Sequence, residues 1–368
     1  MRIYAAVQST KNWRFPRRAV TLRAAVLGAA LAAMCGVSSS ALAAAKGECH
    51  PAYKMTTVKV IYQPSGLSSY FYANAANLWQ KFGVKIDPVK IEAGQSELGA
   101  LANGSIDFAF LGGPPTLTAI GHKLPVKIIF STNNVSHLEG LVVRPSSKIG
   151  NLHDLIGKTV ASPTGSSAWV GMHLTLAHAG VPIDKVHVIN LSPAATLAAF
   201  TAGSIDAAWI WDTWIKRLES VGGKLIAVEH QYGVAEPNTW VVSDSFMKKH
   251  PDVVARFIAA LNAGAEGANK DPKVAAKQYS ELTGVTAAQA VNIMKVEPTF
   301  TISDALNSAS RLSFVNAKSG LANTLAISGD VLKQAGILPG APSREEISNA
   351  IDLNAVKAAR KLSPGCGS

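Results

Sequence analysis

Two segments place glycine at the predicted start of a helix, where backbone N–H groups are left without partners. Gly165, Ser166 and Ser167 lie in "PTGSSAW", and Gly112 and Gly113 lie in "LGGPPT". A helix start presents free N–H groups and a favourable dipole to an anion, and serine hydroxyls add further donors. The second segment is poorer in donors, because its two prolines carry no N–H. The competing interpretation for both segments is an ordinary helix cap.

Two acidic residues stand at the ends of predicted strands. Glu139, in "SHLEGLVV", precedes a strand, and Asp212, in "WIWDTW", follows one. A carboxylate in such a position would accept hydrogen bonds from a cationic ligand group. For Asp212 the competing interpretation is strong, because an Asp before "TWIKRL" is a favourable N-cap residue.

Aromatic residues accompany these segments. Trp169 and Trp211 lie beside the predicted loops and would cover the apolar part of a ligand. Trp209 and Trp240 fall within strand patterns, which favours the core. Gln63 ends the first predicted strand and is a candidate polar contact.

The elements that must position these residues repeat along the chain. From residue 57, β-rich runs alternate with helical runs, which predicts an α/β protein with parallel-rich sheets flanked by helices. "GSIDFAFLGG" (104–113) and "GSIDAAWIWD" (203–212) each follow a short helical run. We expect them to occupy equivalent positions in two similar units, although a coincidence would also produce the pattern. Ligands of open α/β sheets lie beyond the carboxyl ends of the strands, so a cleft is expected there.

The first 43 residues have the pattern of a cleavable export signal. They hold six of the 35 basic residues and no acidic one, and they continue into "AAVLGAALAAMCGV" and a stretch of small residues. Cleavage after Ala43 is predicted. Arg17 and Arg18 leave open a twin-arginine signal in place of general secretion. The mature chain keeps 29 basic against 24 acidic residues, which gives no reason to invoke nucleic acid.

Export also changes the interpretation of the cysteines. Cys35 leaves with the signal, whereas Cys49 and Cys366 remain near the two ends of the mature chain. Two cysteines in an oxidising compartment predict one disulfide. A pair of free thiols is the competing interpretation.

The pattern of reactive residues does not favour catalysis. Among the nine histidines we find no metal-binding spacing, and the sequence shows no nucleophile elbow and no phosphate loop. We therefore expect no metal, no cofactor and no enzymatic activity.

Several of these motifs together resemble a known family. "VIYQPS", "LANGSIDFAFLGGPP", "DLIGKTVASP", "VHVINLSPAATLAAFTAGSIDAAWIWD" and "WVVSDSFMKKHPDVVARFIAA" cover most of residues 60–260. The chain resembles the periplasmic solute-binding proteins of ABC importers in the nitrate/sulfonate/taurine group, and most of all the taurine-binding branch.

The resemblance implies a two-lobed, type II periplasmic binding fold with a ligand cleft between the lobes. Lobe 1 would comprise 50–142 and 239–368, and lobe 2 would comprise 143–238. The crossings would lie near 142–145 and 236–238. The implied partners are a small sulfonate, a membrane permease and its ATPase, and we expect a periplasmic monomer.

The resemblance also implies roles at the site. Gly165–Ser167 or Gly112–Gly113 would bind a sulfonate, and Glu139 and Asp212 would meet an ammonium group. Taurine-binding relatives tend to carry Asp before the "WVV" strand, where this chain has Asn238. The ligand therefore stays open among taurine, other alkanesulfonates and another small anion such as nitrate. Two competing functions also stay open: a sensor module, and an enzyme of the pyrimidine-precursor synthase type that shares this fold.

Overall fold

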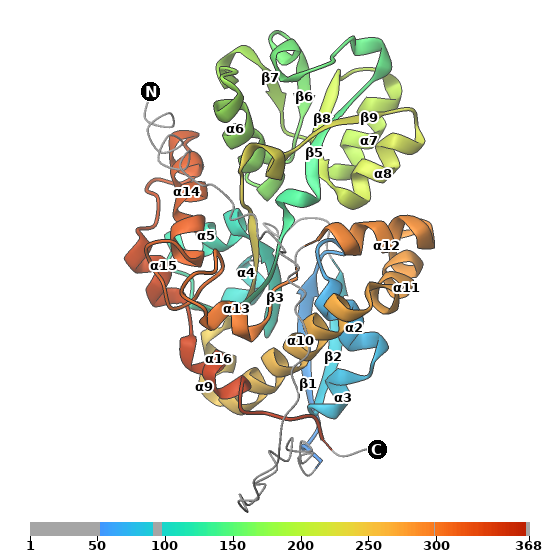
Figure 1. The fold of residues 1–368 in the computed structure, drawn as a ribbon. Coiled ribbons are helices and arrows are strands. Elements are labelled where there is room, and N and C mark those ends of the chain that lie inside the picture. The colour runs from blue at the N-terminus through green and yellow to red at the C-terminus, as the bar shows by residue number, and fades with distance from the viewer. Residues whose placement is uncertain (1–51, 91–97, 298, 366–368) are drawn as a thin grey trace, which may run out of the picture.

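The computed structural model describes residues 52–90, 98–297 and 299–365, and it contains two five-stranded sheets (Figure 1). The predicted signal segment and the predicted Cys49–Cys366 disulfide lie outside these residues. The first sheet has the order β2-β1-β3-β10-β4 and the second has the order β7-β6-β8-β5-β9. The strands are β1 (Thr56–Tyr62), β2 (Val84–Lys90), β3 (Phe108–Gly112), β4 (Val126–Asn134), β5 (Glu139–Val143), β6 (Thr159–Ala161), β7 (His187–Ile189), β8 (Ala207–Trp211), β9 (Lys224–Val228) and β10 (Pro237–Ser243).

The two sheets share one topology. In each, four strands run in the same direction, and a strand from the other part of the chain is inserted antiparallel between the third and the fourth. β10 pairs with β3 and β4 in the first sheet, and β5 pairs with β8 and β9 in the second. The sheets are therefore mixed, whereas the alternating sequence pattern predicts only their parallel part.

Most helices accompany the first sheet, as Figure 1 shows. The helices of this half are α2 (Ser68–Ala75), α3 (Leu78–Lys81), α4 (Leu98–Ala102), α5 (Gly113–Gly121), α9 (Asp244–Lys249), α10 (Pro251–Lys270), α11 (Pro272–Thr283), α12 (Ala287–Val296), α13 (Ile302–Leu306), α14 (Leu321–Gln334), α15 (Arg344–Ala350) and α16 (Leu353–Ala359). The second sheet is flanked by α6 (Ser167–Ala179), α7 (Pro193–Ala202) and α8 (Asp212–Ser220). Within the described residues, no helix combines the length and apolar character needed to cross a membrane.

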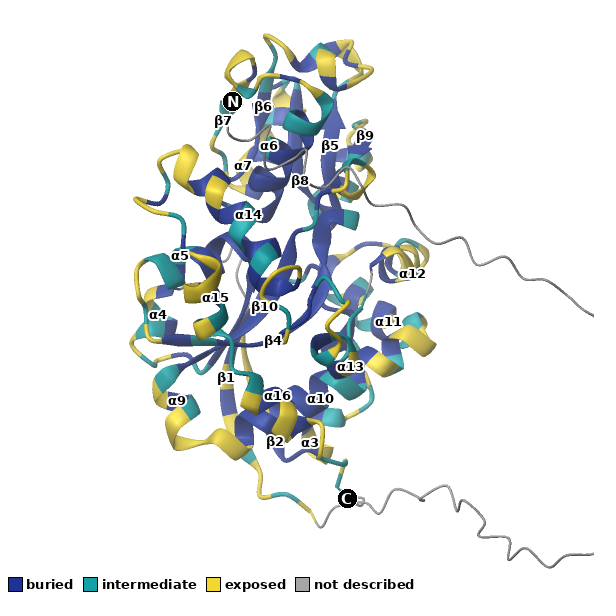
Figure 2. Ribbon diagram, turned by 60° about the vertical axis from the view of Figure 1, so that its left-hand side comes forward, coloured by how far each residue is buried: buried dark blue, intermediate teal, exposed yellow. Residues whose placement is uncertain are grey.

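The strands of both sheets form the core, and the outer faces of the helices are exposed (Figure 2). Trp209 and Trp240 have no exposed surface, which agrees with their prediction as core residues. Around Trp240, the rings of Tyr70, Phe110 and Phe257 lie 5.0–5.9 Å away between centroids. This aromatic packing fixes β10 in the middle of the first sheet.

The chain crosses between the sheets twice, at 135–138 and at 229–236. The backbone N–H of Val135 donates to the carbonyl of Glu236 at 2.9 Å, which ties the crossings together. The rings of His137 and His230 stack across them, with centroids 4.1 Å apart. The first crossing therefore precedes the predicted position near 142–145, because residues 139–143 form a strand of the second sheet. The second crossing begins before the predicted 236–238.

The repeated segments occupy equivalent positions in the two sheets, as the sequence predicts. Each ends in the third strand, β3 or β8. Gly104 and Gly203 both have a positive φ, 75° and 80°, which glycine adopts without the steric cost that a Cβ would add. The carboxylates of Asp107 and Asp206 each accept from a backbone N–H of the neighbouring strand, at 2.8 and 2.9 Å. The repeat therefore specifies a turn and a strand pairing.

Candidate functional site

Five carboxyl groups are buried where the two sheets meet, and none of these residues is more than 5% exposed. They come from strand ends, from the second crossing and from the end of α12, which places them on both sides of the junction. They are Glu139, Asp212, Glu229, Glu236 and Glu297. The four ion pairs of the described residues lie elsewhere and involve none of them. Burying carboxyl groups without a cation is costly, which marks this junction as the candidate site.

Glu139 begins β5 and faces the start of α6. The hydroxyl of Ser167 donates to Glu139 Oε1 at 2.6 Å. The other oxygen, Oε2, is buried and receives no hydrogen bond from an N–H or hydroxyl group of the described residues. Ser167 also lies against Gly112, since a Cβ at Gly112 would be 3.5 Å from its Oγ. The structure thus brings together Glu139, Ser167 and Gly112, which were predicted separately.

Asp212 does not cap its own helix. The N-cap of α8 is Trp211, without a side-chain capping bond. The carboxylate of Asp212 instead accepts from the hydroxyls of Ser65 and Tyr279, which belong to the half built on the first sheet. Thr213 adds a hydrogen bond to Tyr279 at 2.9 Å. Asp212 is therefore a contact between the two halves, and both of its oxygens are occupied.

Glu229 lies at the start of the second crossing, beneath α6. Trp209 Nε1 donates to Glu229 Oε1 at 2.9 Å. A Cβ at Gly171 would overlap the carboxyl group of Glu229. Glycine at 171 is therefore what makes room for this acid.

Glu236 ends the second crossing. Ser328 of α14 donates to Glu236 Oε1 at 2.8 Å, and Oε2 has no partner among the described residues. That oxygen would be 3.6 Å from a Cβ at Gly113. Glu236 therefore presents an unpaired oxygen to the turn that follows β3.

Glu297 follows α12 and is fully paired. The hydroxyl of Ser68 donates to Oε2, and Asn133 Nδ2 donates to Oε1 at 2.9 Å. Glu297 therefore forms a wall of the junction, and each of its oxygens already accepts one hydrogen bond.

Burial changes the acidity of these groups. It raises the pKa of Glu139 to about 8. The hydrogen bond from Ser167 lowers this pKa, and the negative charge of Asp212 raises it. Burial raises the pKa of Glu297 to about 7. It also raises the pKa values of Glu229 and Glu236 well above the usual range, helped in both by the charge of Glu139.

Glu139 and Glu229 are close enough for their carboxyl groups to hydrogen-bond to each other. Two carboxyl groups can do so only when one of them is protonated. In the absence of a cation, the junction therefore retains protons near neutral pH.

The donors of the site are concentrated at the start of α6. Ser166 is the N-cap, and its hydroxyl accepts from the N–H of Trp169 at 3.1 Å. Gly165 has φ 77° and directs the chain into the helix. The N–H of Ser166 donates to the carbonyl of Pro163, so the N–H groups that the start of α6 offers to an anion are those of Ser167 and Ala168. By contrast, α5 begins Gly113-Pro114-Pro115 and offers few N–H groups.

The remaining predicted residues are buried or half-buried. Asn238 is buried in β10 opposite Gly112, and its Oδ1 has no partner among the described residues. Trp169 and Trp211 are only 6% and 5% exposed, and Trp169 packs on the ring of His173. Gln63 follows β1 and is half-buried. Their contact with a ligand stays a prediction.

Sequence reasoning missed Glu229, Glu236 and Glu297. Glu229 and Glu236 flank predicted strands in the same manner as Asp212, so the position of an acid at a strand end was a usable signal. Glu297 lies in the helical C-terminal region, and nothing in its local sequence indicates a position beside the first sheet.

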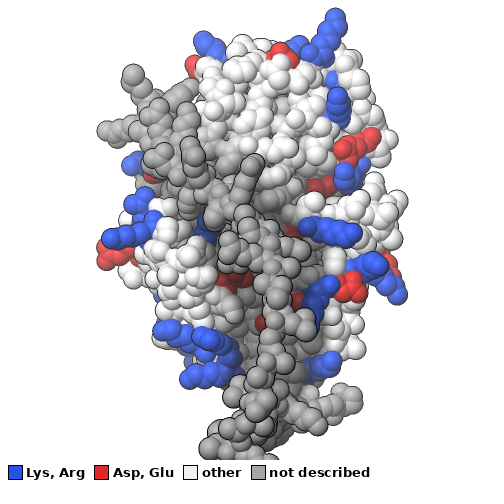
Figure 3. All heavy atoms as spheres, in the orientation of Figure 1, with Lys and Arg blue, Asp and Glu red and all other residues white. Residues whose placement is uncertain are grey.

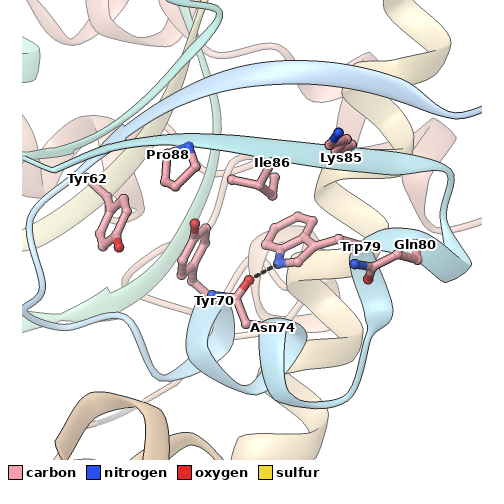
Figure 4. A pocket seen from close by; sticks show the side chains of 8 residues that line it. All are labelled: Tyr62, Tyr70, Asn74, Trp79, Gln80, Lys85, Ile86 and Pro88. Carbon is pink, nitrogen blue, oxygen red and sulfur yellow. Dashed lines mark hydrogen bonds between the residues drawn. The ribbon is translucent and has the colours of Figure 1, made fainter. Parts of the chain in front are cut away.

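Two further surfaces help to delimit the site. A pocket of about 340 Å³ is lined by side chains of β1, β2, α2 and α3, among them Tyr62, Tyr70 and Trp79 (Figure 4). It includes none of the predicted residues. On the face shown in Figure 3, basic and acidic side chains are interspersed over the described surface. No group of three or more metal-ligating side chains is arranged to hold a metal ion in the described ranges.

Two halves of one topology, joined by two crossings around a polar junction, define a two-lobed solute-binding class. Residues 66–275 match the NMT1/THI5-like family model. The chain is 31% identical over 247 residues to the "Taurine-binding periplasmic protein" of Escherichia coli (strain K12), covering 65% of this chain and 76% of that protein. The chain belongs to the NMT1/THI5-like family.

Other relatives point in the same direction. A putative aliphatic sulfonates-binding protein of Bacillus subtilis (strain 168) is 26% identical over 219 residues, covering 59% of this chain and 66% of that protein. The alkanesulfonate-binding protein SsuA from Xanthomonas axonopodis pv. citri, solved with MOPS, has a similar fold with a TM-score of 0.67. It is 24% identical, and the match covers 82% of this chain and 99% of that one. All three relatives are described as binding proteins rather than enzymes.

Proposed function

We propose that this chain is the periplasmic solute-binding component of an ABC importer and that it captures taurine or a related aliphatic sulfonate. The relatives named above support this function. The observation that carries it is the junction itself, where the start of α6 lies beside buried carboxyl groups with unpaired oxygens. An anion-binding end and an acidic end together suit a small zwitterion.

The anion-binding end and the acidic end of the junction would each bind one charged group of the ligand. A sulfonate stays ionised and needs fixed hydrogen-bond donors, which the first turn of α6 supplies. The helix dipole would stabilise the bound anion by about 0.3–2 kcal/mol. An ammonium group that enters a closed junction loses its water and needs acceptors in return. A nitrate ion or a simple alkanesulfonate would satisfy only the first end.

The partners follow from this role. The basic, apolar N-terminal segment would export the chain, and the loaded protein would deliver its ligand to a permease driven by an ATPase. The second crossing and the start of α6 both contact the ligand in this proposal, so binding would hold the two lobes together around the crossings.

Thermal unfolding of the mature chain, starting at residue 44, tests the function. Taurine, ethanesulfonate, β-alanine and nitrate are added in turn. A ligand at 100 times its Kd adds about 2.7 kcal/mol to the free energy of unfolding. We expect taurine to raise the melting temperature most. No stabilisation by any sulfonate would refute the proposed function.

A further inference from the structure

Two buried acceptor atoms that receive no hydrogen bond in the described part of the chain lie beside the turn between β3 and α5, and a third belongs to the nearby Glu139, whose carboxyl group can share a proton with Glu229. They are Glu139 Oε2, Glu236 Oε2 and Asn238 Oδ1, and each belongs to a side chain that is at most 2% exposed. A buried acceptor left unpaired costs about 1–3 kcal/mol, so the two beside the turn, Glu236 Oε2 and Asn238 Oδ1, require an explanation.

Two of these atoms lie against Gly112 and Gly113. Asn238 Oδ1 would be 3.6 Å from a Cβ at Gly112, and Glu236 Oε2 would be 3.6 Å from a Cβ at Gly113. Glu139 reaches the same turn through Ser167, whose Oγ is 2.6 Å from its Oε1 and would be 3.5 Å from a Cβ at Gly112. A Cβ at Gly113 would also come within 2.9 Å of Leu325 Cδ2, so glycine at this position lets the neighbouring side chains approach the turn closely.

The turn offers acceptors and almost no donors. The two prolines of α5 carry no N–H, and none of the ion pairs in the described ranges reaches these carboxyl groups. An anion would face unfavourable oxygens here. An ammonium group carries three N–H donors and one positive charge, which matches three acceptors of which two are carboxyl oxygens.

We infer that the turn at Gly112–Gly113 binds the ammonium end of the ligand, and that Glu236 supplies the negative charge that Asn238 lacks. The sulfonate end of the ligand then lies at the start of α6. This orientation rests on the proposed function. It assigns the ammonium group to the glycine turn, which the sequence alone makes a candidate site for the sulfonate. Glu236 acts as a specificity-determining residue that selects amine-bearing sulfonates.

The other acids of the junction are less suited to this role. Both oxygens of Asp212 accept hydroxyl groups, and both oxygens of Glu297 are paired. The carboxyl group of Glu229 packs against Gly171, is held by Trp209 under α6 and turns toward Glu139. Glu236 is the crossing-segment acid that faces the glycine turn.

The test compares taurine with ethanesulfonate, which lacks only the amine, by isothermal titration calorimetry. Wild-type protein should bind taurine more tightly. Glu236→Gln should weaken taurine binding about 10- to 150-fold, since a charge-assisted hydrogen bond is lost, and change ethanesulfonate binding less than about threefold. Glu297→Gln is the matched control, because it removes a buried carboxyl group whose oxygens are already paired. It should shift both ligands by the same factor.

A series of N-methylated taurines on wild-type protein gives a second readout that does not depend on the folding of any variant. Each methyl group removes one N–H donor and keeps the charge, so affinity should fall stepwise and be weakest for the trimethyl compound. Equal losses of taurine and ethanesulfonate in Glu236→Gln, or equal binding of all methylated forms, would overturn the inference while leaving the proposed function intact. Failure of wild-type protein to bind any sulfonate would instead overturn the proposed function.

Discussion

The two "GSID" segments build the same turn, but the residues that follow their strands differ in chemical character. Ser105 and Ser204 each donate a side-chain hydrogen bond of 3.1 Å to a carbonyl of the preceding helix. Asp107 and Asp206 each accept a hydrogen bond from a backbone N–H of the neighbouring strand. After the strand, one copy continues into the Gly112–Gly113 turn, and the other continues into Asp212.

This difference shows which residues build the scaffold and which determine binding. The repeated residues lie at the amino ends of β3 and β8 and contact the preceding helix and the neighbouring strand of the same half. The divergent residues lie at the carboxyl ends, where the two sheets meet and where ligands of α/β proteins bind. Changes in the first group should affect stability, and changes in the second should affect ligand affinity.

The largest expected effect is a pH dependence of stability that comes mainly from the fully buried acids of the junction, although burial also raises the pKa of Asp107 in the repeat. Glu139 is faced by Asp212, Glu229 and Glu236, and its pKa is raised to about 8 in the folded chain. A carboxyl group with a raised folded pKa stabilises the fold below its unfolded value, near 4.5, and loses that contribution as the pH rises to about 8.

The melting temperature of the ligand-free protein should therefore fall between pH 5 and pH 8. Glu297, whose pKa is raised to about 7, acts in the same direction. Calorimetric melting across this range measures the effect, and a double variant, Glu139→Gln with Glu297→Gln, should make the fall shallower without abolishing it, because Glu229 and Glu236 also have raised pKa values. A melting temperature that rises steadily from pH 5 to pH 8 would contradict this account of the junction.

The second prediction compares one acid of the junction with one of the repeat. Glu139→Gln should weaken taurine binding by about 1.5–3 kcal/mol, because it removes a charge from the ammonium site. Asp107→Asn should leave the Kd within a factor of about two, because its carboxylate holds a backbone N–H at the opposite end of β3 from the glycine turn. Titration calorimetry measures both. An equal loss in the two variants would remove the distinction between scaffold and site.

The third prediction concerns the equivalence of the repeats. Asp107→Asn and Asp206→Asn should each lower the free energy of unfolding by about 1–2 kcal/mol, since each weakens one charge-assisted hydrogen bond to a backbone N–H. Urea unfolding of the two variants measures the effect. Losses that differ by more than about 1 kcal/mol would show that the two turns are not energetically equivalent.

The smallest effect is expected at the glycines of the turns. Gly104→Ala and Gly203→Ala should each cost about 1 kcal/mol, because both residues have a positive φ. Urea unfolding measures this as well, with Gly99→Ala as the control, since a Cβ at Gly99 meets no atom within 4 Å. A neutral result at both turns would mean that the positive φ is not required there.

The sequence predicted the two α/β units and two of the five buried acids at the junction, Glu139 and Asp212, because these depend on local patterns. Strand and helix alternation, the glycines of the repeat and the helix start at Ser166 are visible over a few residues. The crossings were misplaced because the membership of residues 139–143 in the second sheet depends on pairing with β8 and β9. Glycine–carboxyl packing at Gly171 and Glu229 likewise joins distant residues, so no local pattern reveals it.

The most direct test of the central claim is a crystal structure of the mature protein with taurine. The account predicts that the ligand nitrogen lies within hydrogen-bond distance of Glu236, Glu139 and Asn238. The sulfonate oxygens should then accept from the first N–H groups of α6. A sulfonate placed at the Gly112–Gly113 turn, with the amine directed toward α6, would contradict it.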